Sequence, residues 1–146
     1  MKKMIRILCI TVAVLMLFTI PVFATEGSTY SNLFISSYDS FITNPSGNML
    51  RIWFDVVGNG EMDKIGVDYI ELYRSPDGIN WTTIRVFFPE DHPQMTCENT
   101  GIAYDFISYA VSYGYYYRAY VEFYAEDSRG IGTAYDYSET IYVPMP

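Results

Sequence analysis

The sequence predicts an all-β fold, an antiparallel two-sheet sandwich of about seven strands, and three observations lead to it. Beyond its N-terminal segment the chain has no long 3.6-residue periodicity, so α-helices are not expected. It consists instead of short segments rich in Tyr, Ile, Val, Phe and Thr, the residues that fit a pleated sheet. Gly, Pro, Asn and Asp separate these segments at short intervals, which is typical of sandwiches and barrels.

The N-terminal segment has the organisation of a secretory signal peptide. Three basic residues, Lys2, Lys3 and Arg6, precede an uncharged apolar run over residues 7–20, and small residues lead up to Ala24. The run is shorter than the ~20 residues that a membrane-spanning helix needs. We therefore predict a signal peptide over residues 1–24, a short polar linker over 25–29 and a secreted, extracellular β-sandwich over 30–146, with no membrane insertion of the mature chain.

Charge and cysteine content limit what the mature chain binds and what holds it together. Cleavage after Ala24 leaves six of the nine Lys and Arg against all 17 Asp and Glu, a net charge of −11. This balance argues against nucleic acid and anionic membranes as ligands, because proteins that bind them need clustered basic residues. Cys97 is the one cysteine that remains, so no intrachain disulfide forms and a packed core must hold the domain. Cys97 is either buried or paired with a second chain.

The first half of the domain is expected to hold three strands. Residues 31–36 form the first, and the sequence NPSG at 44–47 forms a turn. The second strand, 49–57, alternates, with one set of side chains facing inward: Leu50, Ile52, Phe54 and Val56. A glycine-rich flexible loop follows at 58–63 (GNGEMD). The third strand, 67–75, directs Ile70 and Leu72 inward.

The second half repeats this pattern of strands and breakers. Proline and glycine are suitably placed for a turn at 76–78, and a strand follows at 81–88. Two prolines exclude residues 89–93 from a strand interior. Further strands are expected around 103–108, within 114–127 and at 138–143, with a loop at 126–132.

Three stretches together resemble the fibronectin type III fold, an immunoglobulin-like sandwich. YIELYRSPDGINWTTI (69–84) is similar to that family's third strand, turn and following strand. GYYYRAYV (114–121) is similar to its sixth strand, and SETIYV (138–143) to its closing strand. The chain departs from the family at Tyr109, where leucine is usual, and at Val111, where proline is usual. Phe54 rather than Trp53 occupies the inward site of the family's second-strand tryptophan.

The resemblance implies structural roles for two tyrosines. Tyr115 takes the tyrosine-corner position, where its hydroxyl would bond to the backbone a few residues upstream. Tyr117 would belong to the core. The segments MDKIGVDYIELYRSPDG and GYYYRAYVEFYA, together with the signal peptide, also resemble small secreted proteins of Gram-positive bacteria that have no assigned activity. This second resemblance implies a compartment and a shape but no chemistry.

Strand alternation divides the tyrosines between two faces. With Tyr115 inward, Tyr117 and the alternate residues through Ala125 are inward as well. The third and last strands would lie beside this one in a fibronectin-like sheet. One outer face would then carry a tyrosine-rich set with Glu71 and Glu122 between its members: Tyr69, Tyr73, Tyr116, Arg118, Tyr120, Tyr124 and Tyr142.

This face has two interpretations. Tyrosine has a high strand propensity, and cross-strand aromatic pairs stabilise sheets by roughly 0.2–1 kcal/mol each. Tyrosine and arginine also dominate protein interfaces, and tyrosine rings stack on sugars. We predict a non-catalytic binding or interaction module that contacts a protein or a cell-surface glycan through this face. The alternative is a carbohydrate-binding or calcium-binding accessory protein.

Calcium is the cofactor that the acidic loops would suit; no other cofactor is expected. Asp55, Asn59, Glu61 and Asp63 lie in or next to the glycine-rich segment 58–63. Oxygen ligands in flexible loops suit Ca²⁺, although no EF-hand pattern is present and acidic loop residues are usually just solvated.

Catalytic residues are not predicted. The single histidine, His92, has Glu90 and Asp91 beside it and Cys97 five residues away, but no nucleophile motif surrounds them. One histidine and one cysteine do not complete a zinc site. A small secreted hydrolase built on His92 and Cys97 is the minor alternative.

Overall fold

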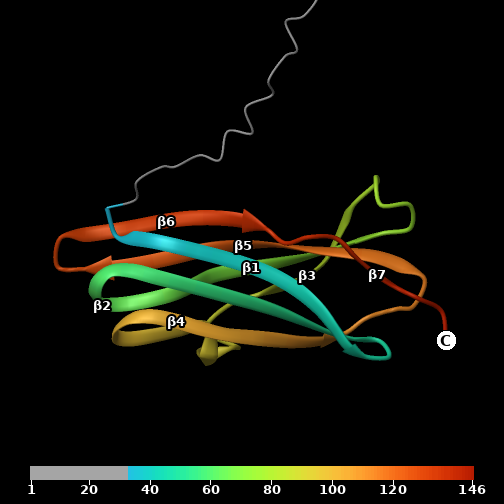
Figure 1. Ribbon diagram of the computed structural model, residues 1–146, viewed down its shortest axis with the longest axis horizontal. Coiled ribbons are helices and arrows are strands. Elements are labelled where there is room, and N and C mark those ends of the chain that lie inside the picture. The colour runs from blue at the N-terminus through green and yellow to red at the C-terminus, as the bar shows by residue number, and fades with distance from the viewer. Residues whose placement is uncertain (1–32) are drawn as a thin grey trace, which may run out of the picture. The chain divides into compact units, whose positions relative to one another are not determined.

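The computed structural model describes residues 33–146 (Figure 1). The predicted signal peptide, the linker and the first two residues of the strand expected at 31–36 lie outside the described residues. The described part is all-β, with seven strands and one short 3₁₀ helix, η2 (Pro93–Met95). The strands are β1 (Ile35–Ser46), β2 (Met49–Ser75), β3 (Thr82–Phe87), β4 (Thr96–Ala110), β5 (Tyr115–Asp127), β6 (Gly130–Tyr137) and β7 (Ile141–Val143). No helix in residues 33–146 is long and apolar enough to cross a membrane.

All seven strands belong to one antiparallel, hydrogen-bonded sheet that curls around its core. β2 is its central member: its first half lies between β1 and β4, and its second half pairs with β5 and β3. β5 continues the sheet to β6, and β7 pairs with the first residues of β5. Figure 1 shows β1 crossing in front of β5, while β4 lies along the opposite side. β2 therefore connects every part of the sheet.

β2 runs without interruption through the segment that was expected to be a loop. Residues 58–63 keep strand conformation, and the register with β4 shifts between Val57 and Met62. Gly58 and Gly60 lie within this irregularity, and Gly60 has a φ of +121°. The glycines thus mark a bulge rather than a break, since glycine permits this backbone shape and the buried Met62 ties the segment to the core.

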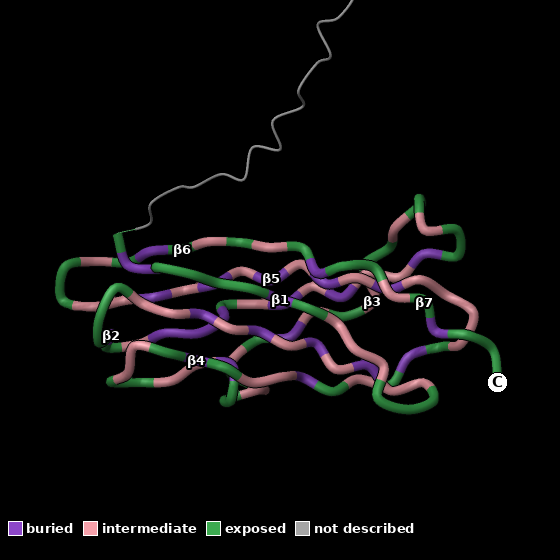
Figure 2. Tube along the Cα trace, in the orientation of Figure 1, coloured by how far each residue is buried: buried purple, intermediate pink, exposed green. Residues whose placement is uncertain are grey.

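The core includes most of the side chains that the alternation predicted to face inward, together with residues of β1, β3, β4 and η2. On the first half of β2 these are Leu50, Ile52, Phe54 and Val56, all fully buried. Ile70 and Leu72 follow on the second half, and β5 contributes five alternate positions: Tyr117, Ala119, Val121, Phe123 and Ala125. Figure 2 shows this alternation of buried and part-exposed positions along the strands. These residues form a single hydrophobic cluster, so the curled sheet has one core.

The tyrosine that bonds to the upstream backbone is Tyr117 and not Tyr115. Its hydroxyl donates to the Ser112 carbonyl at 2.7 Å, and its ring is fully buried. Tyr115 lies half-buried at the edge of the core with the guanidinium of Arg74 over its ring at 4.6 Å. The resemblance therefore implied this bond for a tyrosine two residues too early, because alternation puts both tyrosines on the same side of β5 and does not distinguish them.

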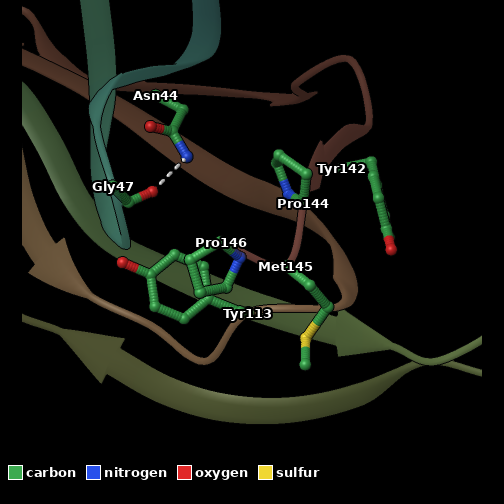
Figure 3. A pocket seen from close by; sticks show the side chains of 7 residues that line it. All are labelled: Asn44, Gly47, Tyr113, Tyr142, Pro144, Met145 and Pro146. Carbon is green, nitrogen blue, oxygen red and sulfur yellow. Dashed lines mark hydrogen bonds between the residues drawn. The ribbon is translucent and has the colours of Figure 1, made fainter.

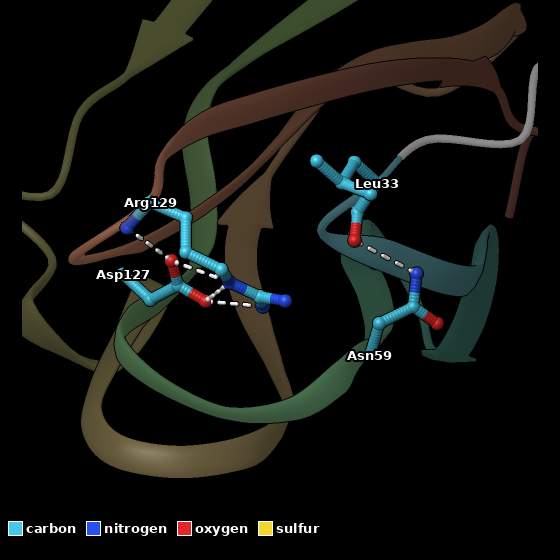
Figure 4. A network of polar contacts seen from close by, with 4 residues as sticks. All are labelled: Leu33, Asn59, Asp127 and Arg129. Carbon is cyan, nitrogen blue, oxygen red and sulfur yellow. Dashed lines mark hydrogen bonds and ion pairs between the residues drawn. The ribbon is translucent and has the colours of Figure 1, made fainter.

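Strand boundaries differ from those predicted at both ends of the domain. β1 covers Ile35–Ser46 rather than 31–36 and includes the first three residues of the turn expected at 44–47. β4 is longer than the expected 103–108, and β7 is shorter than 138–143. The loop expected at 126–132 is instead a tight turn between β5 and β6. Asp127 accepts from the Arg129 backbone N–H at 2.7 Å and pairs with the Arg129 guanidinium, and Gly130 has a φ of +144° (Figure 4).

The turn expected at 76–78 is present, and Asp77 organises it. The backbone N–H groups of Asn80 and Ile79 donate to the Asp77 carboxylate at 2.8 and 2.9 Å. The Asn80 amide and the Ser75 hydroxyl donate to the same carboxylate. These donors favour the ionised form, so they hold the pKa of Asp77 well below its usual range. Asp77 thus fixes the approach of β3 to β2.

An inward-facing acid connects β6 to β1. The Asp136 carboxylate accepts from the Ser40 hydroxyl at 2.9 Å and from the Ser40 backbone N–H at 3.2 Å. The bond joins two strands that are not paired in the sheet. A charged side chain at this position also makes the edge of β6 a poor template for pairing with another chain.

Candidate functional site: the tyrosine face

The second half of β2, β5, β6 and β7 present a shared outer surface that we call the tyrosine face. Its members are Tyr69, Tyr73, Tyr116, Arg118, Tyr120, Tyr124, Tyr135, Tyr137 and Tyr142. The pairing registers place Tyr73 opposite Arg118, Tyr120 opposite Tyr137, and Tyr116 opposite Tyr142. The strand pairing thus positions on one surface all seven residues that the sequence predicted for it.

Tyr120 is at the centre of the ring contacts on this face. Its ring centroid lies 5.7 Å from that of Tyr69, 5.7 Å from that of Tyr135 and 5.1 Å from that of Tyr137. Tyr116 and Tyr142 form a separate pair at 4.8 Å. The rings therefore follow one another across β2, β5 and β6, and the outermost ones, Tyr135 and Tyr137, are 63% and 50% exposed.

Tyr135 and Tyr137 were missed from the sequence. Their strand, GIGTAYDY, has glycines at its first and third positions; residues 130–132 fall in the expected loop, and no strand was predicted for 133–137. The alternation of Thr133, Tyr135 and Tyr137 was the signal that could have identified the strand and its outward side. The contact of Trp81 with Arg118 of the face was also missed. It depends on how the turn at 76–80 folds back, which no local sequence pattern shows.

Arg118 is enclosed by aromatic rings. Its guanidinium carbon lies 4.3 Å from the ring centroid of Trp81, 5.4 Å from that of Tyr137 and 5.6 Å from that of Tyr73. Its Nε is buried and has no hydrogen-bond partner within the described residues. Cation–π attraction therefore takes the place that an ion pair would have.

Three tyrosines of the face donate their hydroxyls to glutamates two residues away on the same strand. Tyr120 donates to Glu122 at 3.2 Å, Tyr73 donates to Glu71, and Tyr124 donates to Glu126.

These positions raise the pKa of all three phenols. Desolvation is the first cause in each case, and neighbouring side chains add to it; for Tyr124 the pKa reaches about 12. The tyrosines therefore stay neutral at physiological pH and the charge of the face comes from its carboxylates.

Every Lys and Arg of residues 33–146 lies over an aromatic ring. The six are Arg51, Lys64, Arg74, Arg85, Arg118 and Arg129. One ion pair occurs among the described residues, between Arg129 and Asp127 (Figure 4). The same residues include 16 of the chain's 17 acids, all except Glu26. The acids thus outnumber the cations, and the cations are engaged by rings.

The residues proposed as calcium ligands are spread along β2. Asp55 lies between Asp39 of β1 and Tyr104 of β4 in the sheet register. The Asn59 side chain donates to the Leu33 carbonyl at 3.1 Å (Figure 4). Glu61 and Asp63 are exposed. Within the part of the chain that the structure describes, no three His, Cys, Asp or Glu side chains gather as metal ligands.

The residues of the hydrolase alternative lie near η2. His92 precedes the helix, and its ring packs edge-on against Phe87 at 5.4 Å. Cys97 is half-buried near the start of β4. Across residues 33–146 the structure records no hydrogen bond from the His92 ring to Cys97 or to a carboxylate.

Two further surface features lie outside the tyrosine face or at its margin. Phe41, Trp53 and Phe106 form a row across β1, β2 and β4, with Trp53 at 5.8 and 4.5 Å from its neighbours. Near the C-terminus, a hollow of about 430 Å³ has a largely aromatic and proline lining (Figure 3). Its residues are Asn44, Gly47, Tyr113, Tyr142, Pro144, Met145 and Pro146.

Comparison with known proteins identifies no relative. No protein-family model matches the chain, and neither the curated proteins nor the solved structures give a match.

Proposed function

We propose that this protein is a secreted, non-catalytic binding module that contacts a protein partner through the tyrosine face. The observation that carries the proposal is the continuous set of ring contacts across three strands, ending in the exposed rings of Tyr135 and Tyr137. Exposed aromatic surface that is contiguous, rather than scattered singly, marks interaction sites. Tyrosine and arginine are also the residues that most often carry interface energy.

The pre-arranged side chains favour binding over a purely structural role. Ring contacts and hydroxyl bonds to glutamate hold Tyr73, Tyr120 and Tyr124 in place before any partner arrives. A partner therefore has less side-chain freedom to restrict, which lowers the entropic cost of association. The core does not need Tyr135 or Tyr137, because at least half of the surface of each residue is exposed to solvent.

We also propose that the curled sheet is a two-layer sandwich of the fibronectin type III kind. One layer would consist of β1, the first half of β2 and β4. The other would consist of β3, the second half of β2, β5, β6 and β7. Residues 49–57 of β2 pair with β1 and β4, and residues 67–75 pair with β5 and β3, which supports this division. Residues 64–66 pair with both β4 and β5, so the chain would pass between the layers over 58–66.

The test removes the most exposed rings of the face and leaves the core intact. The double variant Tyr135→Ser, Tyr137→Ser is compared with Tyr104→Ser, which removes an equally exposed ring from β4. Wild-type protein is first screened on protein and glycan arrays, and each hit is then titrated by calorimetry. We expect a protein hit whose affinity falls at least about tenfold in the double variant and stays unchanged in the control.

Three outcomes contradict the proposal. Folded wild-type protein that binds nothing on the protein array is one of them. A hit that survives the double substitution is another, because the site then lies elsewhere. Signal on the glycan array alone would replace the protein partner with a carbohydrate.

A further inference from the structure

We infer that the partner segment is cationic, an extended peptide whose arginine side chain enters a second aromatic cage on the tyrosine face. This cage consists of Tyr69, Tyr120, Tyr135 and Glu122. The inference rests on the proposed function, because it names the chemistry of the partner for the same face.

The cage is built by the strand registers. Glu122 on β5 lies directly opposite Tyr69 on β2 and directly opposite Tyr135 on β6. Tyr120 stands next to Glu122 on the same side of β5, with its ring 5.7 Å from each of the other two rings. The Tyr120 and Tyr135 rings are inclined by only 24°. A carboxylate therefore lies beside or opposite three tyrosines on three neighbouring strands.

The cage of Arg118 shows what such a group of rings holds. There, three aromatic side chains, Tyr73, Trp81 and Tyr137, surround a guanidinium that belongs to the chain itself. The second cage has the same number of rings and adds Glu122, but no Lys or Arg of residues 33–146 lies over its rings. Rings and a carboxylate attract a cation by cation–π and ion-pair forces together.

Charge complementarity supports a cationic occupant. The second half of β2 and β5 carry four acids on or beside the face: Asp68, Glu71, Glu122 and Glu126. Arg118 of the face and Lys64 beside it already lie over rings of the face. The surface surrounding the cage is thus net negative, which attracts basic segments and repels acidic ones.

Arginine fits the cage better than lysine does. Its guanidinium is planar, so it stacks on tyrosine rings while its N–H groups reach a carboxylate in a bidentate arrangement. The ammonium of lysine is more strongly hydrated and presents no plane for stacking. The chain's own use of Arg118 in the neighbouring cage follows the same preference.

The experiment uses acetylated, amidated peptides of alternating arginine and threonine as the probe. Matched peptides carry lysine or citrulline in place of arginine; citrulline keeps the shape of the side chain and removes its charge. Binding is measured by fluorescence anisotropy at low and at physiological salt. We expect the arginine peptide to bind, the lysine peptide to bind more weakly and the citrulline peptide not to bind.

Two variants separate the cage from general charge attraction. Glu122→Gln removes the carboxylate of the cage, and Glu61→Gln removes one exposed charge of β2 outside the face. We expect Glu122→Gln to weaken arginine-peptide binding about tenfold, because a charge-assisted pair is lost, and Glu61→Gln to change it less than twofold. Tyr135→Ser, with folding verified by circular dichroism, is expected to weaken binding to a similar degree.

The outcomes distinguish the inference from the function on which it rests. Equal binding of the citrulline or lysine peptide overturns the arginine cage, and so does an equal effect of the two glutamine variants. A protein hit that depends on Tyr135 and Tyr137 but carries no basic segment would overturn the inference and leave the proposed function standing. If neither the protein hit nor the arginine peptide depends on these residues, the tyrosine face is not the binding site.

Discussion

At the scale of single residues, Tyr117 shows what alternation can and cannot resolve. The sequence predicted that Tyr115 and Tyr117 share the inner side of β5, and the burial of Tyr117 agrees with that. Which of the two bonds to the backbone depends on where the segment before β5 crosses the end of the sheet. That crossing brings the Ser112 carbonyl to 2.7 Å from the Tyr117 hydroxyl, and strand periodicity contains no information about it.

Removing that hydroxyl should destabilise the protein. Tyr117→Phe removes the bond that the hydroxyl of the buried Tyr117 donates to the Ser112 carbonyl, so we expect the free energy of unfolding to fall by about 1 kcal/mol. The measurement is equilibrium unfolding in urea. Tyr115→Phe is the matched control and should change stability by less than about 0.5 kcal/mol. Equal effects of the two substitutions would contradict the assignment of the corner to Tyr117.

At the scale of elements, local patterns identified strands well and their ends poorly. The alternation of Leu50, Ile52, Phe54 and Val56 was sufficient to identify the first half of β2, because each inward residue is apolar. The continuation through Gly58 and Gly60 was not predicted, since glycine marks loops and bulges alike. β6 was hidden for the same reason, and with it Tyr135 and Tyr137 of the candidate site. Turn chemistry was recognised where proline and glycine stood together, at 76–78.

Gly66 is the position where β2 tolerates no side chain. Its φ is +153°, and a Cβ there would lie 2.1 Å from the Met95 carbonyl oxygen and 2.7 Å from the Thr96 Cα. Gly66→Ala must therefore push β2 away from the start of β4, and we expect a loss of about 2–4 kcal/mol in the free energy of unfolding.

Gly60→Ala serves as its control. Gly60 also has a positive φ, but a Cβ there meets nothing within 4 Å. Its substitution should cost only the backbone strain, about 1 kcal/mol. Thermal unfolding followed by circular dichroism compares the two, and a Gly66→Ala protein as stable as Gly60→Ala would show that β4 is free to move aside.

At the scale of the whole molecule, the six cations of the described part lie over aromatic rings, and only one of the acids, Asp127, forms an ion pair. The acidic balance and the high tyrosine content are evident from the composition alone. Composition could not predict that all six basic residues of the described part would lie over rings, because most of these contacts join segments that are distant in sequence. The proposed cage around Glu122 depends on strand register in the same way, since it joins residues of β2, β5 and β6.

The tyrosine pKa values predict a loss of stability at alkaline pH. Burial raises the pKa of Tyr73, Tyr120 and Tyr124 in the folded protein, whereas tyrosine in the unfolded chain titrates near 10. As the pH rises past about 10, the unfolded chain therefore loses protons before the folded protein does, and the free energy of unfolding falls. Below that pH both states keep these protons and the contribution is constant.

Urea unfolding at about pH 8 and about pH 11, together with tyrosinate absorbance, tests this pH dependence. The midpoint should be lower at the higher pH. Replacing the three tyrosines with phenylalanine should reduce the difference between the two midpoints. A difference as large as that of the wild type would assign the alkaline effect to other groups.

The length of β2 has a consequence for how the chain is made. Synthesis delivers residues 49–75 well before residues 115–127, yet the second half of β2 depends on β5 for its main pairing. Until β5 emerges, the apolar side of that half, including Ile70 and Leu72, lacks the strand that mainly packs beside it. A nascent chain that ends before β5 therefore has no complete core, and folding waits for non-local pairing. A ribosome-bound intermediate of this protein would be a substrate for chaperones rather than a partly folded domain.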